Sequence, residues 1–411
     1  MPAEASRIAP ARLFHGWIVV WAAFAVMLLG FGAAYSFTVF FGALQEAFGA
    51  SRGSLSLAFS IAGGLWFFLG ALSGPLADRF GPRGTTLFGM TVAGLGLLLV
   101  SRASALWHVY LGFGACMGIG VGFSYVPAIG VVQRWFVRRR GFASGVAVSG
   151  IGVGTLAMPP LAALLLAEFG WRWAAALLGG LVIAAGAIAA WLLDSDPHRR
   201  GLAPDNDAVD IAAPRPALAG LTLTEALRTR AYITLFLAFM SASLGLFIPF
   251  VHLVPYAEDH GVPHGTAVLL VSGIGLGSTA GRFLLGSVAD RLGRRFSFGL
   301  MYLGMASMLL WWLASGTSWR LIVFALVFGT CYGGFVALAP AVAVDYFGAR
   351  SAGAIIGTLY AAVGVGTFAG PLLAGIAFDL LRSYTLPILA SAVTMLLGAL
   401  LVGLMGKPPS R

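Results

Sequence analysis

Twelve long apolar stretches constrain the fold of this chain more than any other feature of its sequence. A helix needs about 20 residues to cross a hydrocarbon core of ~30 Å, because each residue adds ~1.5 Å. Lipid supplies no hydrogen-bond partners, so each stretch is expected to form an α-helix. The spans are predicted at residues 16–46, 54–78, 84–102, 106–135, 139–168, 171–193, 229–257, 266–290, 296–315, 319–346, 351–380 and 384–406. The sequence therefore predicts an all-α membrane protein with twelve transmembrane helices.

Charged residues are sparse and unevenly placed. They make up 10% of the chain, whereas soluble proteins contain about 25%. With both termini on one side of the bilayer, 19 of the 25 Lys and Arg residues fall on that side and five on the other, and Arg282 lies inside a span. The positive-inside rule then predicts cytoplasmic termini. The net charge of +10 is explained by this topology, so no nucleic acid partner is expected.

The sequence repeats with a shift of 212 residues. Residues 74–81 then meet 286–293, and 152–155 meet 364–367, so that Asp-Arg-x-Gly and Gly-Val-Gly-Thr recur in both halves. Six spans thus recur as six in the same orientation. This pattern predicts two lobes related by a pseudo-two-fold axis.

The predicted lobes are residues 1–193 and 229–411. The segment 194–228 between them is rich in Asp, Pro and Arg and lacks long apolar runs, which is typical of a linker. It is expected on the cytoplasmic side. In two-lobed transporters of this kind the substrate site lies between the lobes, near the middle of the membrane.

Arg282 is the one charge placed deep in a span. It is eight residues from the next charge, Asp290, and therefore ~12 Å from that charged end. A permanent cation at this depth costs at least ~2.5–3.5 kcal/mol. A mobile carboxylate would supply the missing counter-charge through two parallel charge-assisted hydrogen bonds. The alternative is a permanent ion pair, but the cores of the other predicted spans contain no Asp or Glu.

The repeated motif Gly-x-x-x-Asp-Arg-x-Gly, at 74–81 and 286–293, resembles the signature of the major facilitator superfamily. The resemblance covers the whole chain and implies that superfamily's fold. It also implies that the motif residues cap and pair at cytoplasmic helix ends and latch the outward-open state. The residues concerned are Asp78, Arg79, Asp290 and Arg291.

A narrower resemblance is to the monocarboxylate transporter family and its relatives, the oxalate:formate antiporters. It rests on His-Gly-Trp at 15–17, Ser-Phe-Thr-Val-Phe-Phe at 36–41 and the segment 135–150 that enters the fifth span. Arg282 matches the family's pore arginine. The resemblance implies a short monocarboxylate as substrate, a co-transported proton in place of any bound cofactor, and a functional monomer.

The chain departs from the family at informative positions. Tyr35 stands where animal members carry a lysine, and Ser278 stands where they carry an aspartate one turn before the pore arginine. Lys407 is the only lysine. The oxalate antiporters add a lysine on the eleventh span, but residues 357–370 contain no cation. A single fixed positive charge suits one carboxylate, so a monocarboxylate is preferred to a dicarboxylate.

Depth along the spans predicts the rest of the pocket. Tyr332 and Phe335 lie ~20–25 Å from the outer end of the tenth span, level with Arg282. Tyr332 could donate a hydrogen bond to a carboxylate, and Phe335 could contact its alkyl end. Each further candidate has packing as its alternative role. These candidates are Leu28, Tyr35, Tyr125, Ser149 and Ser278.

A proton route is predicted on the seventh span. His252, Pro255, Tyr256 and Asp259 share one helical face. Asp259 in a partly dehydrated mouth, together with His252, could take up a proton while the anion is bound. In the alternative interpretation, Asp259 is a solvated helix end and His252 a hydrogen-bonded pore residue.

Three transport functions remain open: a proton-linked symporter for lactate or pyruvate, a proton-independent carboxylate exchanger, and an efflux carrier for apolar drugs. An enzyme is not expected, because the sequence has no metal motif, P-loop or paired-carboxylate constellation. Short connecting loops favour the inner membrane of a prokaryotic cell as the location.

Overall fold

The computed structural model describes residues 14–200, 202–206, 219–348 and 350–406. Within these ranges the chain is helical apart from its connections and one isolated β-bridge, between Gly220 and Gly348. Eleven helical segments are long and apolar enough to cross a membrane. One of them, α7 (Arg140–Leu192), has 53 residues and leaves helical geometry at Gly170, so it crosses twice. The prediction of an all-α membrane fold with twelve spans is confirmed.

The first six crossings form a group that we call the N lobe. In it α7 packs against α1 and α4, while α6 packs against α3 and α4. The elements are α1 (His15–Tyr35) continued by α2 (Phe37–Phe48), α3 (Arg52–Phe80), α4 (Pro82–Ser101), α5 (Leu106–Val109) continued by a π-helical segment (Tyr110–Cys116) and α6 (Met117–Trp135), and α7.

The last six crossings form the C lobe. Here α11 packs against α13, α12 against α13 and α15, and α9 against α14 and α15. The elements are α9 (Arg230–Leu246) continued by α10 (Ile248–Asp259), α11 (His264–Leu292), α12 (Arg294–Leu313), α13 (Ser318–Phe347), α14 (Ala352–Leu381) and α15 (Thr385–Leu404).

The repeated motif forms equivalent turns in the two lobes. Gly81 between α3 and α4 has φ 84°, and Gly293 between α11 and α12 has φ 92°. Glycine adopts this left-handed region without a steric penalty, which explains its place at both turns. Helix α4, which follows the first turn, begins without a side-chain cap hydrogen bond. Asp78 therefore does not cap α4.

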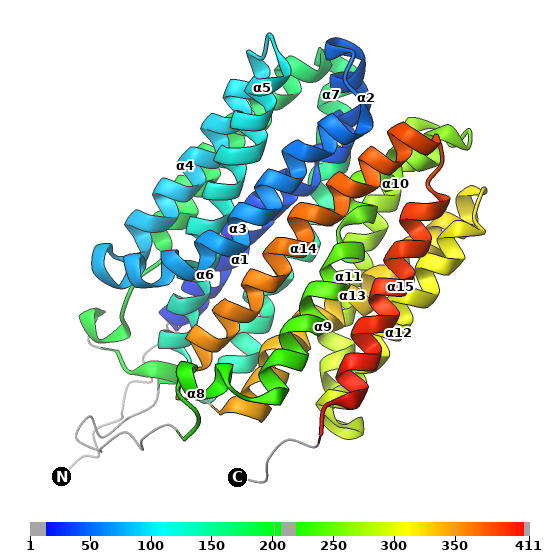
Figure 1. Ribbon diagram of the computed structural model, residues 1–411. Helices are drawn as coiled ribbons and strands as arrows, with labels where there is room; N and C mark the ends of the chain where they lie inside the picture. Colours follow the sequence, from blue (N-terminus) through cyan, green and yellow to red (C-terminus); the bar gives the residue numbers. More distant parts are fainter. Residues whose placement is uncertain (1–13, 201, 207–218, 349, 407–411) are drawn as a thin grey trace, which may run out of the picture.

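The two lobes meet along three helix pairs: α3 with α14, α7 with α11, and α2 with α10 (Figure 1). Both described ends of the chain lie on one side of the bundle, called the terminal side here, and the opposite side is the distal side. The α3–α14 contact runs from Gly53 against Asp379 at the distal end to Phe67 against Tyr360, whose ring centroids are 5.9 Å apart. On the terminal side, a Cβ added to Gly145 or Gly353 would meet no described atom within 4 Å. The described contacts between the lobes therefore extend from the distal end into the middle of the bundle.

The described part of the segment between the lobes consists of two 3₁₀ turns, Pro197–Arg200 and Pro204–Asn206, and α8 (Leu223–Leu227). The Asp205 carboxylate accepts hydrogen bonds from the backbone N–H groups of Val137 (2.8 Å) and Arg138 (2.7 Å) before α7. The backbone N–H of Leu221 donates to the carbonyl of Phe347 on the C lobe (2.8 Å). The segment is thus hydrogen-bonded to both lobes.

Replacing Asp205 with alanine is expected to release the segment from the N lobe. Partial burial would raise the pKa of Asp205, but the backbone N–H donors outweigh it and hold that pKa below its usual value. The contact is therefore complete above about pH 4 and is lost as the pH falls through the lowered pKa. A net hydrogen-bond contribution of ~1 kcal/mol predicts about fivefold faster protease cleavage between the lobes at neutral pH. Equal cleavage of the two proteins would contradict this.

Candidate functional site

Arg282 is held on α11 by close packing of that helix against α13. A Cβ on Gly277 would lie 2.2 Å from the carbonyl of Leu326, and one on Gly281 would lie 2.0 Å from the carbonyl of Thr330. Only glycine permits the two backbones to approach this closely, as is common between membrane helices. This packing fixes the Cα of Arg282 in the interior of the C lobe and sends its side chain towards the N lobe.

The Arg282 guanidinium is buried and has no described counter-ion. The residue is 7% exposed. Its nitrogens Nε, Nη1 and Nη2 have no hydrogen-bond partner among the residues that the structure describes. The nearby polar groups are the neutral side chains of Tyr35, Tyr125 and Tyr332. A buried cation without an acidic partner is costly, so the arrangement favours the arrival of an anion.

The three tyrosines come from both lobes. Tyr35 of α1 and Tyr332 of α13 share a hydrogen bond of 3.2 Å between their hydroxyl groups. The Tyr35 ring also stacks on Phe250 of α10, with 4.5 Å between ring centroids. Tyr125 lies on α6. The structure thus brings Tyr35, Tyr125 and Tyr332 to Arg282, as the depth estimate predicts for Tyr332.

The other pocket candidates contribute less. Phe335 packs inside the C lobe, with its ring stacked on Phe298 at 5.2 Å and facing away from solvent at 4% exposure. The Ser149 hydroxyl donates to the carbonyl of Val146 at 2.7 Å within its own helix. The Ser278 hydroxyl is buried without a described partner, and Leu28 of α1 is half-buried. In this conformation Ser149 bonds within its own helix, in line with the packing alternative, and Phe335 packs inside the C lobe, where the depth estimate predicts a pocket residue.

His252 lies between the lobes and is fully buried. Its Nε2 is 3.0 Å from the carbonyl of Pro371, which can only accept, so Nε2 carries a proton. Its Nδ1 then accepts from the Tyr384 hydroxyl at 3.1 Å. Ser56 of the N lobe lies 3.2 Å from Nε2. His252 is therefore a hydrogen-bonded residue of the lobe interface.

Asp259 is the exposed last residue of α10, and it also forms an ion pair with the opposite lobe. Its carboxylate accepts two hydrogen bonds from the Arg52 guanidinium, at 2.6 and 2.7 Å, and this ion pair joins α10 to α3 across the lobes. The same guanidinium donates to the Tyr384 hydroxyl at 2.9 Å. A hydrogen-bonded chain therefore connects Asp259 through Arg52 and Tyr384 to His252.

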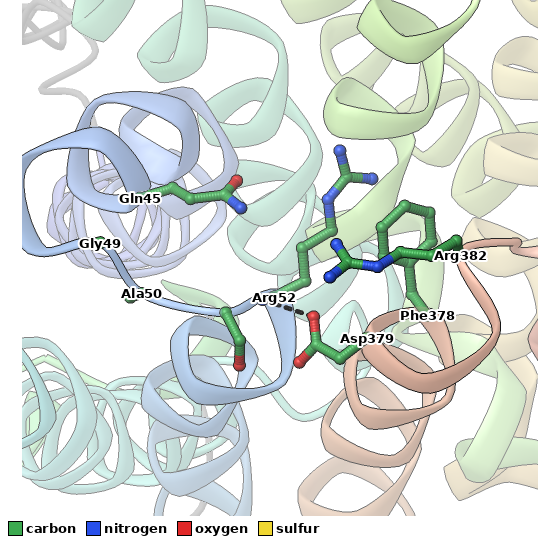
Figure 2. Close-up of a pocket in the computed structure, with 8 residues that line it drawn as sticks. Gln45, Gly49, Ala50, Arg52, Phe378, Asp379 and Arg382 are labelled. Carbon is green, nitrogen blue, oxygen red and sulfur yellow. Dashed lines mark hydrogen bonds between the residues drawn. The ribbon is translucent and has the colours of Figure 1, made fainter.

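Asp379 strengthens the same distal contact. Its carboxylate accepts from the backbone N–H groups of Arg52 (3.0 Å) and Gly53 (2.8 Å) at the beginning of α3. An acidic group is favoured at this position, because the first N–H groups of a helix lack partners within the helix. A cavity of about 450 Å³ opens beside these residues and is also lined by Gln45, Phe378 and Arg382 (Figure 2).

On the terminal side, the repeated motif makes no described contact between the lobes. Asp78 pairs with Arg134 of its own lobe at 3.5 Å. Arg79 and Arg291 are exposed, and the side chain of Asp290 lies outside the described residues. Among the latch residues whose side chains the structure describes, Asp78 therefore forms an ion pair within the N lobe.

Sequence reasoning missed Arg52, Asp379 and Tyr384. All three are polar residues at helix ends, where the sequence shows only that they can reach solvent. Arg52 was counted as a topological charge, and its partner Asp259 lies 207 residues away. The signal that could have found this ion pair is that Arg52 and Asp259 have opposite charges and both lie at distal ends of spans, in different lobes.

The comparisons with known proteins agree with this architecture. The model of the Major Facilitator Superfamily matches residues 20–267 and 231–411. Monocarboxylate transporter 3 of Mus musculus is 32% identical, over 90% of this chain and 75% of the relative. Monocarboxylate transporter 11 of Homo sapiens is 30% identical, over 96% of this chain and 84% of the relative. The chain belongs to the monocarboxylate transporter family of that superfamily.

Membership of this family makes the protein an integral, multi-pass membrane transporter rather than an enzyme. A solved bacterial homolog of the human lysosomal transporter Spinster, in an inward-facing and unoccupied conformation, matches 94% of this chain and 96% of its own. The TM-score is 0.75 at 15% identity, which shows the shared fold. The family resemblance seen in the sequence is confirmed.

Proposed function

We propose that this protein carries short monocarboxylates such as lactate or pyruvate across the membrane by proton symport with alternating access. The observation that carries the proposal is the buried Arg282 guanidinium without a described counter-ion. The relatives are named monocarboxylate transporters. We propose a monocarboxylate substrate for this chain from those names together with the buried Arg282.

The chemistry of the site supports one carboxylate as cargo. A planar guanidinium can bind both oxygens of a carboxylate at once, and the buried surroundings strengthen those hydrogen bonds. Tyr35 and Tyr332 currently bond to each other, so either hydroxyl can turn to the anion. Among the described residues near Arg282 there is no second cation to bind a second carboxylate.

The distal network supports the proton step. Asp259 is partly exposed, with 37% of its side chain accessible, whereas its partner Arg52 is 12% accessible. A proton from the distal water would neutralise Asp259 and remove the charge that holds Arg52. Parting of the lobes on that side would then be easier. His252, at the inner end of the chain of hydrogen bonds, is the second proposed proton site.

In the proposed orientation the chain crosses the inner membrane of a prokaryotic cell twelve times, and both termini lie in the cytoplasm. The distal side then faces outwards. Since the lobes are joined there by Asp259–Arg52 and Asp379–α3, the described conformation corresponds to closure on the outside. The functional unit is proposed to be a monomer, because the two lobes of one chain together form a complete site.

The test is transport by the purified protein in liposomes. Uptake of labelled lactate is expected to follow an inward proton gradient, and to be inhibited by pyruvate and other monocarboxylates more than by oxalate or succinate. Two external pH values separate the alternatives. Uptake by counterflow that persists after the gradient is collapsed, without coupled acidification, would instead identify a carboxylate exchanger. Export of apolar drugs that survives Arg282→Ala would identify an efflux carrier.

A further inference from the structure

Gly152 of α7 faces Arg282 across the lobe interface. A Cβ added at Gly152 would lie 2.9 Å from Nη1 of Arg282, 2.2 Å from Oγ1 of Thr279 and 3.0 Å from the carbonyl of Gly275. Gly275, Thr279 and Arg282 follow one another on a single face of α11, at spacings of four and three residues. A side chain at this position of the opposite lobe would therefore overlap the space that the guanidinium occupies.

The crossing of α7 and α11 is close from both sides. A Cβ on Gly275 would lie 2.5 Å from the backbone nitrogen of Leu156 and 2.7 Å from the carbonyl of Gly152. Gly152 and Gly275 thus allow the backbones of α7 and α11 to come into contact. These two helices belong to different lobes. Arg282 lies two turns along α11 from Gly275, at the edge of this crossing.

The repeat supplies an equivalent crossing without the arginine. Gly364 lies 212 residues after Gly152, and a Cβ there would lie 3.2 Å from Cβ of Phe67 on α3. Phe67 is the equivalent of Thr279 by the same shift, and Gly70 is the equivalent of Arg282. Both crossings join the lobes, and the atoms nearest to a Cβ at Gly364 belong to the uncharged residues Phe67, Phe68 and Gly64.

We infer that Gly152 is a positioning residue for substrate binding: it keeps open the space in which the Arg282 guanidinium spans the lobe interface. This inference rests on the proposed function of Arg282 and goes beyond it, because it assigns a role in substrate affinity to a residue of the opposite lobe. Arg282 is part of α11, whereas the space for its guanidinium is left by Gly152 of α7. Carboxylate binding is therefore linked directly to the relative position of the lobes.

The test separates displacement of Arg282 from simple crowding at Thr279. Thr279→Ala removes the nearest atom, and Gly152→Ala is then added in that background. In the double variant the new methyl group still meets Nη1. Losing the alignment of one of two charge-assisted hydrogen bonds is expected to raise KM about tenfold over Thr279→Ala alone, with the maximal rate within about threefold.

Gly364→Ala is the matched control, because it crowds the equivalent crossing without touching Arg282. It is expected to change the maximal rate and leave KM within about twofold of the parent. A KM in the Gly152→Ala, Thr279→Ala protein equal to that of Thr279→Ala would overturn the inference. So would an equal rise in KM in Gly364→Ala.

A second variant covers the case in which Gly152→Ala does not fold. Thr279→Ile narrows the same space from α11, and folding is checked by a single monodisperse peak in detergent. A raised KM is expected here too, and an unchanged KM in the folded Thr279→Ile protein would contradict the inference. Should neither lactate nor pyruvate be transported by the unaltered protein, the proposed function fails first, which distinguishes the two failures.

Discussion

Replacing Arg282 with lysine is expected to reduce monocarboxylate transport at least about 100-fold while the protein remains folded. Lysine keeps the charge but offers a point donor in place of the planar pair of N–H groups that a carboxylate binds. Hydrogen bonds to charged groups contribute ~1.5–3 kcal/mol each, and ~2.7 kcal/mol corresponds to a factor of about 100. The measurement is the initial rate of labelled lactate uptake into liposomes.

Arg102→Lys is the matched control for this variant, because Arg102 is an exposed arginine at the end of α4. Its uptake is expected to equal that of the unaltered protein. The Arg282→Lys protein should elute as one species in detergent, since Arg282 makes no described hydrogen bond that lysine would remove. Normal transport by the lysine variant would show that recognition by two parallel hydrogen bonds is wrong.

Replacing Asp259 with asparagine is expected to abolish proton-driven accumulation and to preserve exchange. Asparagine cannot release or bind a proton, and it removes the charge from the two hydrogen bonds to Arg52. Gradient-driven uptake should fall about tenfold or more, because the half-buried Arg52 then has no acidic partner whose protonation can release it. Exchange of internal for external lactate, which needs no net proton movement, is the second measurement.

Glu258→Gln is the control for Asp259→Asn. Glu258 is the neighbouring acid, and it pairs with His264 of its own lobe at 2.5 Å. Its removal leaves the contact between lobes intact, so proton-driven uptake should change little. Accumulation that still follows the proton gradient in Asp259→Asn would remove this residue from the coupling mechanism and leave His252 as the remaining candidate.

Much of the central site was accessible from the sequence, for a specific physical reason. A charge in the middle of an apolar span is so costly that Arg282 could be singled out without any knowledge of its neighbours. Distance along a membrane helix is also nearly proportional to residue number, so Tyr332 could be placed at the level of Arg282. Depth does not say which way a side chain points. For this reason Phe335 was predicted in the pocket, although it packs within the C lobe.

The distal network was accessible only in part. Asp259 and His252 could be placed on one helical face, because a helix repeats every 3.6 residues. Their partners Arg52, Tyr384 and the carbonyl of Pro371 belong to other helices. No local pattern pairs residues that are more than a hundred positions apart, so the ion pair and the state of His252 became visible only in the folded chain.

The amino-acid sequence alone determined the number of spans, the two-fold repeat, the family and the position of one buried cation. Each of these follows from local quantities, such as apolar length, charge and motif spacing, which the bilayer turns into structure without reference to distant residues. The tertiary structure alone decided how the lobes meet: the Arg52–Asp259 ion pair, the cap of Asp379 on α3 and the space at Gly152 for Arg282. These contacts join residues of different lobes, and their geometry depends on how whole helices pack against each other.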